Sequence, residues 1–502
     1  MATGTADAIV TTTPPGTPGS PAGPRPRDRV LVGVAAGVAA WLLVVLATRL
    51  PFGSPLGVED NGDGYRLFCG AGLTPNTLDG FASWKNGWIA SYALGPPTCA
   101  DPVPSSALVI ARASTLLVSG SWSPVVLGWI YAVLVGVVVG LGAWAASAAG
   151  LRRALAMAIP VLPLAAATFP RFFVSTYSEP AGLLGAVAAA AGVAAVLVTR
   201  REHRAARVTA LVLTAAGGLL ATTAKVAYVP LLAAAVLVCA VTAIGVRHTR
   251  RAGPALAVAT VLLAALPVTA ALDRQQQFYE SVNAHNLVFT TVLLELGPSA
   301  AADLGMPPAA VARTGDGYFN DEPRPDGQAW WENAILDHPG DTRTAALALL
   351  AEHPAAAARA VGVGLQATTF ADLRYLDSPP APPSTLSTTS GDLGMSGSRQ
   401  PDLSRALNDT GRPPWLPTAL VLVAFAAAAT ARWQGRAGRW SLAAGLSAAT
   451  ALALVVVAVA GDGYYEVFKH VWLAAYLLGL SGLCLVGAVA TGAVGLVRTR
   501  RG

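Results

Sequence analysis

The sequence predicts an all-α polytopic membrane protein with about ten transmembrane helices and two long extracytoplasmic loops. Composition is the first reason: 54% of the residues are hydrophobic, only 12% are charged, and the mean hydropathy is +0.52. Soluble proteins carry about 25% charged residues, so a single water-soluble domain is excluded. The second reason is a series of apolar segments, and the third is the arginine clusters that occupy every second connection between them.

Ten segments are apolar enough to be spanning helices, which need about 20 mostly apolar residues. They are residues 30–47, 125–146, 154–169, 181–198, 208–221, 226–246, 254–272, 416–429, 441–460 and 471–497. The fifth and the eighth are short and rich in alanine. Residues 1–29 are rich in Thr, Pro, Gly and Ala, which predicts a disordered cytoplasmic tail.

The arginines predict the orientation, because basic residues concentrate in the cytoplasmic loops of membrane proteins. Clusters precede the first segment and follow the second, fourth, sixth, eighth and tenth: Arg25, Arg27 and Arg29; Arg152 and Arg153; Arg200, Arg201, Arg204 and Arg207; Arg247, Arg250 and Arg251; Arg432, Arg436 and Arg439; Arg498, Arg500 and Arg501. We therefore expect a multi-pass protein of the cell membrane with both termini in the cytoplasm. The net charge of +6 does not indicate nucleic-acid binding, because the arginines lie in short clusters between apolar segments.

This topology divides the chain into the tail 1–29, seven helices with an outer loop at 49–124 (residues 30–272), a second outer loop region at 273–415, and three final helices (416–502). In the first loop, Trp84, Trp88 and Tyr92 have the spacing of one face of an interfacial helix. Cys69 and Cys99 share this loop, where a disulfide is permitted but not required. In the second loop, residues 275–296 and 339–368 are predicted to be helical, whereas 378–412 is rich in Pro, Ser, Thr and Gly and is expected to be mobile.

The richest polar motif directly follows the first apolar segment, in residues 59–66. Asp60 and Asp63 are candidates for a general base, and Glu59 lies beside them. Arg66 is suited to an anionic phosphate, because a guanidinium offers fixed, forked donors. An isolated Gly-Asp-Gly is usually only a solvated turn, which is the structural alternative here.

Two further groups of polar residues are predicted at outer helix ends. Arg171, Tyr177 and Glu179 precede the fourth segment; capping of the helix by Glu179, with Pro180 at its first position, is the structural alternative. Lys225 lies in the short turn between the fifth and sixth segments, where a lysine that only reaches toward the membrane surface is also expected.

A last group, Asp462, Glu466, Lys469 and His470, leads directly into the tenth segment. If the helix begins near Tyr464, Glu466 shares a face with Lys469 and His470. These residues form either a structural ion pair or part of a binding site, since charges at the membrane end of a helix usually face a cavity or a partner.

The tetrad Gly-Asp-Gly-Tyr occurs three times, at 62–65, 315–318 and 461–464. The outer two belong to the groups described above and are site candidates. The middle one has no predicted helix end beside it and is interpreted as a turn.

Together these motifs resemble a bacterial glycan-biosynthesis hexose transferase family of GT-C-type polytopic membrane glycosyltransferases. The resemblance rests on NGDGYR at 61–66, STYSEP at 175–180 and GDGYYEVFKH at 461–470, with shorter similarities at 285–289, 304–307 and 374–376. It implies a GT-C-like fold and transfer of a hexose from a polyprenyl-phosphate donor to a cell-surface glycan on the extracytoplasmic face. GT-C enzymes place an essential acid in the first outer loop, the place that Asp63 or Asp60 occupies here. The proline-rich tail and residues 378–412 depart from the family pattern. What the resemblance implies therefore applies to the fold and not to acceptor recognition.

On this hypothesis the protein is an inverting hexosyltransferase in which Asp63, or else Asp60, takes the proton of the acceptor hydroxyl. The other charged and polar residues would bind substrate, the cations at the departing phosphate and the acids at sugar hydroxyls: Arg66, Glu59, Arg171, Tyr177, Glu179, Lys225, Asp462, Glu466, Lys469 and His470. No cofactor is indicated with certainty, and a divalent cation at the acids is a lesser alternative. The partners would be the donor, a glycan or lipid-linked acceptor, and the bilayer.

Two other classes of function remain. A transporter or flippase of lipid-linked glycans is expected to carry charges near the bilayer midplane and internal repeats, whereas the predicted charges gather at one face. A non-catalytic scaffold of a cell-envelope complex would leave the clustered acids unexplained. The sequence contains no P-loop and no dinucleotide fingerprint.

Overall fold

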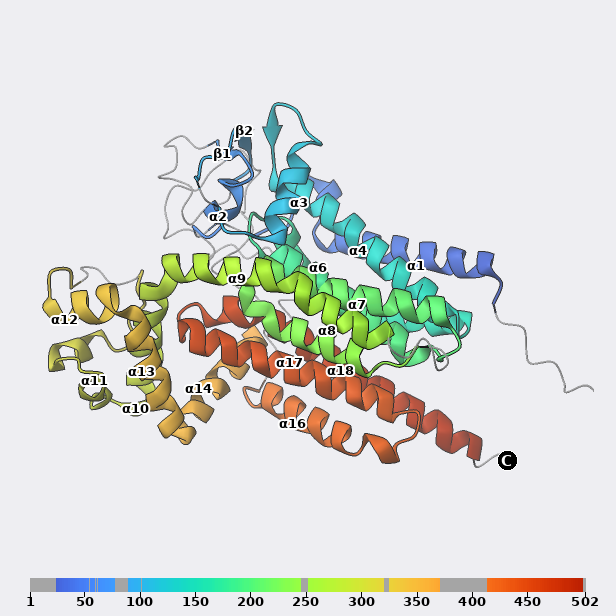
Figure 1. The fold of residues 1–502 in the computed structure, drawn as a ribbon. Coiled ribbons are helices and arrows are strands. Elements are labelled where there is room, and N and C mark those ends of the chain that lie inside the picture. The colour runs from blue at the N-terminus through green and yellow to red at the C-terminus, as the bar shows by residue number, and fades with distance from the viewer. Residues whose placement is uncertain are drawn as a thin grey trace, which may run out of the picture.

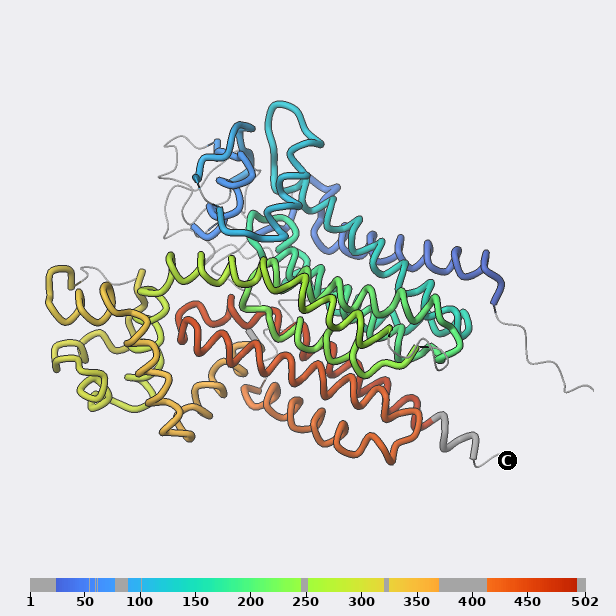
Figure 2. The backbone as a smooth tube through the Cα atoms, viewed as in Figure 1, coloured from blue at the N-terminus to red at the C-terminus, as the bar shows by residue number. Residues whose placement is uncertain are grey.

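The computed structural model describes residues 24–53, 55–58, 60, 62–76, 89–100, 102–244, 252–319, 325–370 and 413–499. Long helices run alongside one another in a bundle, and the start of α1 and the end of α18 lie at the same end of it (Figure 1). Shorter elements gather at the opposite end, as the backbone tube also shows (Figure 2). Among the predicted features, Glu59, Asn61, Trp84, Trp88 and residues 374–376 and 378–412 lie outside the described residues.

Seven helices in the described part of the chain are long and apolar enough to cross a membrane. They are α1 (Pro26–Ala47), α4 (Pro124–Ser147), α6 (Glu179–Val198), α7 (Arg204–Ala224), α9 (Ala252–Leu287) with its continuation, α17 (Gly438–Asp462) and α18 (Val467–Thr499). They coincide with the first, second, fourth, fifth, seventh, ninth and tenth predicted segments. The prediction of a helical polytopic membrane protein is confirmed.

The other three predicted segments are not long straight helices. The sixth and eighth are shorter apolar helices, α8 (Val229–Val241) after the 3₁₀ turn η6 (Val226–Tyr228), and α16 (Leu416–Ala429). The third was predicted as one helix over 154–169, and this is wrong: the chain forms η3 (Leu151–Met157), α5 (Ala158–Val161) and η4 (Leu162–Ala165). Pro160 and Pro163 explain the breaks, because a proline has no backbone N–H to donate within a helix.

Helix α9 is much longer than its apolar part. It continues through the π-helical turn η7 (Val288–Val292) into α10 (Leu293–Leu296), giving one helix of 45 residues. The predicted end at residue 272 is therefore wrong, and the predicted helix 275–296 is the second half of the same element. The sequence has no glycine or proline between Pro267 and Gly297, so nothing ends the helix where its apolar run ends.

Glycines let several helices in the bundle approach closely. A Cβ on Gly37 of α1 would lie 2.6 Å from the carbonyl oxygen of Gly136 in α4. A Cβ on Gly185 of α6 would lie 2.6 Å from that of Gly217 in α7. Small residues at such crossings allow tight van der Waals packing, which drives helix association where lipid removes the hydrophobic effect.

A small lobe follows α1 and carries the only β-structure among the described residues. Strands β1 (Leu73–Pro75), β2 (Tyr92–Leu94) and β3 (Ser121–Trp122) form an antiparallel sheet in that order. Beside them lie η1 (Leu50–Phe52), α2 (Tyr65–Phe68) and α3 (Ser106–Thr115). Tyr92 was predicted on an interfacial helix, and this is wrong: it lies on β2, 1% exposed, with its ring against Phe68 and Trp122.

A second lobe follows α10 and has its own apolar core, in which Phe289, Trp331 and Ile335 are buried. Its elements are α11 (Ala300–Asp303), η8 (Pro308–Arg313), α12 (Ala329–Trp331), the π-helical η9 (Glu332–Asp337), α13 (Pro339–Glu352), α14 (Pro354–Ala367) and η10 (Thr368–Phe370). The helix predicted over 339–368 is present but divides at His353, where Pro354 begins a new helix. The turns η5 (Pro170–Phe173) and η12 (Ala431–Trp433) complete the described elements.

A disulfide joins Cys69 and Cys99 across the first lobe, whereas Cys239 and Cys484 are free and buried.

We predict that thiol labelling of the unfolded, unreduced protein modifies two of its four cysteines, and that reduction exposes the other two. Replacing both Cys69 and Cys99 by Ala should lower stability by about 2–4 kcal/mol, the usual effect of a cross-link over a loop of this order. Labelling of all four cysteines before reduction would contradict the pairing.

Candidate functional site

A cavity of about 840 Å³ lies at the end of the bundle opposite the start of α1. It is bordered by the turn after α1, by the connection between α7 and α8, by the polar half of α9, and by the connection between α17 and α18. Eight acidic, basic or histidine side chains line it: Asp63, Arg66, Lys225, Glu280, Arg343, Asp462, Glu466 and His470. Six of these eight, all except Glu280 and Arg343, were predicted as site residues.

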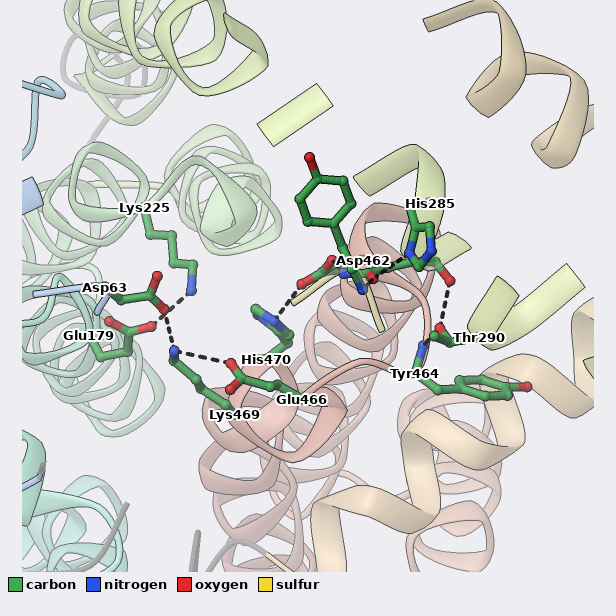
Figure 3. Close-up of polar contacts among 12 residues, drawn as sticks. Asp63, Glu179, Lys225, His285, Thr290, Asp462, Tyr464, Glu466, Lys469 and His470 are labelled. Atoms are coloured by element: carbon green, nitrogen blue, oxygen red, sulfur yellow. Dashed lines mark hydrogen bonds and ion pairs between the residues drawn. The ribbon is translucent and has the colours of Figure 1, made fainter. Parts of the chain in front are cut away.

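Asp63 is the centre of the charged contacts. One oxygen of its carboxylate accepts from Arg66 Nη2 and the other from Lys469 Nζ. Lys469 Nζ also lies 3.3 Å from Glu466 Oε2 (Figure 3). Burial by itself would raise the pKa of Asp63, but the charges of Arg66 and Lys469 hold this pKa well below its usual range. Asp63 is therefore an ionised carboxylate that remains 31% exposed toward the cavity.

Asp60, the other candidate base, is placed differently. It is 4% exposed, and its Oδ1 accepts from the backbone N–H groups of Gly62 at 2.8 Å and Gly64 at 3.0 Å. Its Oδ2 has no hydrogen-bond partner among the described residues. Burial raises the pKa of Asp60 to about 6. Asp60 holds the turn that presents Asp63 and does not line the cavity.

Glu179 and Lys225 form a second ion pair close to this centre. Glu179 Oε1 accepts from Lys225 Nζ at 2.8 Å, and its Oε2 accepts from Ser178 Oγ at 3.2 Å. Glu179 is 2% exposed, and it is the first residue of α6 rather than the residue that caps it. Lys225 lines the cavity with a side chain 17% exposed, so its ammonium is fixed by Glu179 instead of reaching freely toward the membrane surface.

His470 and Asp462 form a third pair, supported by a relay of hydrogen bonds. His470 Nε2 lies 2.9 Å from Asp462 Oδ2, and Asp462 Oδ1 accepts from Asn286 Nδ2 at 2.6 Å. Asn286 Oδ1 in turn accepts from the backbone N–H of Tyr318 at 2.8 Å. The relay ties the ends of α17 and α18 to α9 and to the second lobe (Figure 3).

The turn between α17 and α18 is tightly constrained. Gly463 has φ +60° and Glu466 has φ +46°, a region that non-glycine residues rarely adopt. The N–H of Tyr464 donates to Thr290 Oγ1 at 2.8 Å, and a Cβ on Gly463 would lie 2.6 Å from the carbonyl oxygen of Asn286. Helix α18 begins at Val467 rather than near Tyr464, so Glu466 precedes the helix.

Four of the described residues that were predicted to bind substrate do not line the cavity. Glu179 and Arg171, in η5, are each 2% exposed, Tyr177 is 3% exposed and Lys469 is 1% exposed. The predicted contact of Lys469 with a phosphate stays a prediction; in the structure its ammonium is enclosed by Asp63, Glu466 and the ring of Tyr177, whose centroid lies 5.1 Å from Nζ. Lys469 and Tyr177 thus position the residues that face the cavity.

Sequence reasoning missed the contribution of α9 and the second lobe. Five polar residues of α9 line the cavity: Gln275, Gln276, Tyr279, Glu280 and Asn283. The Arg66 guanidinium lies 4.1 Å from the centroid of the Tyr279 ring. Spacings of three and four residues put these polar side chains on one face of a helix that the sequence already predicts, so this signal was available.

The middle Gly-Asp-Gly-Tyr tetrad is more than a turn. A Cβ on Gly317 would overlap the ring of Tyr465, and Phe319 lines the cavity. Gly317 of the second copy therefore packs against Tyr465, the residue that follows the third copy. In the described part of the chain, no group of three or more His, Cys, Asp or Glu side chains is arranged to hold a metal ion.

A family model described as YfdI N-terminal transmembrane domain matches residues 28–366 of the chain, which is more than half of it. The match includes the turn that carries Asp63 and Arg66, and Lys225, but ends before α16, α17 and α18. Comparison with curated proteins and with solved structures gave no match.

We predict that Gly463→Ala destabilises the protein by about 1–3 kcal/mol, because alanine is strained at this φ and its Cβ would meet Thr290 and Asn286. The melting temperature of the purified protein in detergent measures this. Gly461→Ala is the matched control, since a Cβ there meets nothing within 4 Å and should change little. Equal melting temperatures for the two variants would contradict the close approach.

A second prediction concerns pH. Because the pKa of Asp60 is raised to about 6 in the folded protein, the folded state binds this proton more tightly than the unfolded chain does. Asp60 therefore lowers stability as the pH rises from about 4 through 6. Asp60→Asn should remove that part of the pH dependence and leave the protein at least as stable as wild type at pH 7. Melting temperatures measured between pH 4 and 7 test this, and identical pH profiles for the two proteins would refute it.

Proposed function

We propose that this chain, which belongs to the YfdI N-terminal transmembrane domain family, is a membrane glycosyltransferase that moves a hexose from a polyprenyl-phosphate donor to an acceptor glycan. The observation that carries the proposal is the ionised Asp63 carboxylate, held by two cations at the wall of a cavity that both charged and apolar side chains line. A GT-C-like fold and an extracytoplasmic site are parts of the same proposal.

The cavity lining suits both halves of such a donor. Arg66, Lys225 and Arg343 provide cationic groups for a phosphate, and a guanidinium can bind two phosphate oxygens at once. Apolar side chains from the membrane helices continue the lining: Val229 of α8, Leu272 of α9, and Leu454, Val457 and Ala458 of α17. A phosphate at the charged side would leave a polyprenyl chain to run along this apolar side into the bilayer.

The proposed reaction is an inverting displacement at the anomeric carbon. The acceptor hydroxyl oxygen forms the new bond to that carbon, the bond to the phosphate oxygen breaks, and the electron pair leaves with the polyprenyl phosphate. Asp63 takes the hydroxyl proton as the bond forms, a contribution worth about 10²–10⁴-fold in rate. Arg66 and Lys225 stabilise the charge that grows on the phosphate.

The low pKa of Asp63 fits this role only when substrate is bound. A carboxylate paired with Arg66 and Lys469 is a weak base, and catalysis favours a pKa nearer the working pH. A donor phosphate beside Arg66 would share the charge of that guanidinium and bring a second negative charge close to Asp63. Both effects raise the pKa of Asp63, so donor binding would itself make the base stronger.

The remaining residues would orient the sugar and the base. Asp462, Glu466 and Glu280 offer carboxylate acceptors for sugar hydroxyls at the cavity surface. Asp60 and Lys469 would act through Asp63, Asp60 by holding its turn and Lys469 by fixing its charge.

We predict that Asp63→Asn lowers hexose transfer by about 10²–10⁴-fold while the protein still folds, because the amide cannot accept the proton. The measurement supplies labelled polyprenyl-phosphate hexoses to membranes that contain equal amounts of wild type or variant. Asp303→Asn, an exposed position on α11 away from the cavity, is the control and should transfer normally.

The outcomes separate the alternatives. Full transfer by Asp63→Asn with loss in Asp60→Asn would assign the base to Asp60. Absence of transfer from every donor, together with movement of lipid-linked glycan across the membrane, would favour a transporter or flippase.

A further inference from the structure

A second cavity, of about 1670 Å³, lies among the ends of α6, α7, α8, α17 and α18, at the end of the bundle where α1 begins. Seven charged residues line it, six of them arginines: Arg153, Arg200, Arg201, Arg207, Arg436, Arg439 and Glu202. The single acid is already engaged, since Glu202 Oε1 lies 3.7 Å from Arg200 Nη1. The cavity therefore has a large excess of positive charge.

One of these arginines is buried, and no acid among the described residues lies within ion-pair distance of it. Arg207 is 8% exposed, and its Nη1 donates to the carbonyl oxygen of Thr199 at 3.0 Å. Its Nε has no hydrogen-bond partner among the described residues. A buried charge without a counter-charge is costly, so this guanidinium is poised to gain from a negative ligand in the cavity.

Hydrogen bonds to the backbone fix the positions of Arg207 and of a second arginine. Its hydrogen bond to Thr199, together with a 3.4 Å contact from Arg439 Nη1 to the carbonyl oxygen of Leu197, places two guanidinium groups against the carboxyl end of α6. Helix carboxyl ends attract cations, because their last carbonyl groups lack helical partners. Arg207 from α7 and Arg439 from α17 thereby converge from two different helices.

Much of the rest of the lining is apolar, with Val196, Leu197, Val241, Leu442 and the ring of Trp440 beside a few threonines and Gln434. A soluble anion or a nucleic acid would need only the cationic groups. A ligand that meets cations at one level and apolar side chains beside them, at the end of membrane helices, matches a phospholipid whose phosphate lies at the membrane surface.

We propose that this cavity binds an anionic phospholipid of the bilayer, with its phosphate between Arg207, Arg439 and the arginines at the rim and its acyl chains along the apolar lining. The site lies at the opposite end of the bundle from Asp63. The proposal therefore stands whether or not the protein transfers a sugar. If an anionic phospholipid binds in this cavity, the stability of the protein depends on the lipid composition of the membrane.

The test compares two pairs of exposed arginines at the same end of the molecule. Arg153 and Arg436 line the cavity, whereas their sequence neighbours Arg152 and Arg432 do not. The double variants Arg153→Gln/Arg436→Gln and Arg152→Gln/Arg432→Gln remove the same charge and spare Arg207, whose loss could disturb folding. The delipidated full chain in detergent is titrated with phosphatidylglycerol, with phosphatidylcholine of the same acyl chains, or with inorganic phosphate, and the melting temperature is followed.

We expect phosphatidylglycerol to raise the melting temperature of wild type and of Arg152→Gln/Arg432→Gln at similar concentrations. Arg153→Gln/Arg436→Gln should need about tenfold more of this lipid, since each arginine at a lipid surface contributes several-fold to affinity. Equal weakening in both double variants would overturn the site and leave only a general surface attraction. An equal response to phosphatidylcholine, or to inorganic phosphate at the same concentration, would overturn the assignment to an anionic lipid.

Discussion

The candidate site depends on one contact above all, the one between the Lys469 ammonium and the Asp63 carboxylate. The two residues are 406 positions apart, and the contact joins the turn after the first helix to the start of the last. Lys469 is 1% exposed, so removal of Asp63 would leave its buried ammonium with Glu466 as the remaining acid in contact. The same contact gives the cavity its ionised carboxylate.

The surrounding structure restrains both partners of this contact. Asp60 holds the turn that carries Asp63 through two backbone N–H groups. The α17–α18 turn that precedes Lys469 rests on α9 at Gly463, where no side chain would fit. Since α9 continues unbroken past the apolar bundle, it carries Asn286 and Thr290 to that turn and Tyr279 to Arg66. One long helix therefore braces both sides of the cavity.

The two ends of the bundle differ in the chemistry of their cavities. At one end acids pair with lysines, an arginine and a histidine, which fixes these side chains and leaves Asp63 as an oriented acceptor. At the other end arginines predominate, and one of them is buried beside apolar side chains. Side chains in ion pairs are held in defined positions. An excess of charge of one sign instead attracts ligands of the opposite charge. The helices between them are joined by close glycine contacts.

By itself, the sequence determined the membrane class, seven of the long helices, and six of the eight acidic, basic or histidine residues at the cavity, because apolar length and clustered charge are local properties of the chain. It left open the choice between Asp60 and Asp63, and it assigned Lys469, Tyr177 and Arg171 to ligand contact. Only the tertiary structure decided which of these side chains face the cavity, since exposure depends on how segments pack: Asp60 is buried and bound to the backbone of its own turn, and Lys469 is enclosed by residues from three parts of the chain. The contributions of Tyr279, Arg343 and the middle Gly-Asp-Gly-Tyr tetrad likewise arise from the long path of α9 and the packing of the second lobe. Such long-range contacts have no signature in one sequence, because they are set by how distant helices meet.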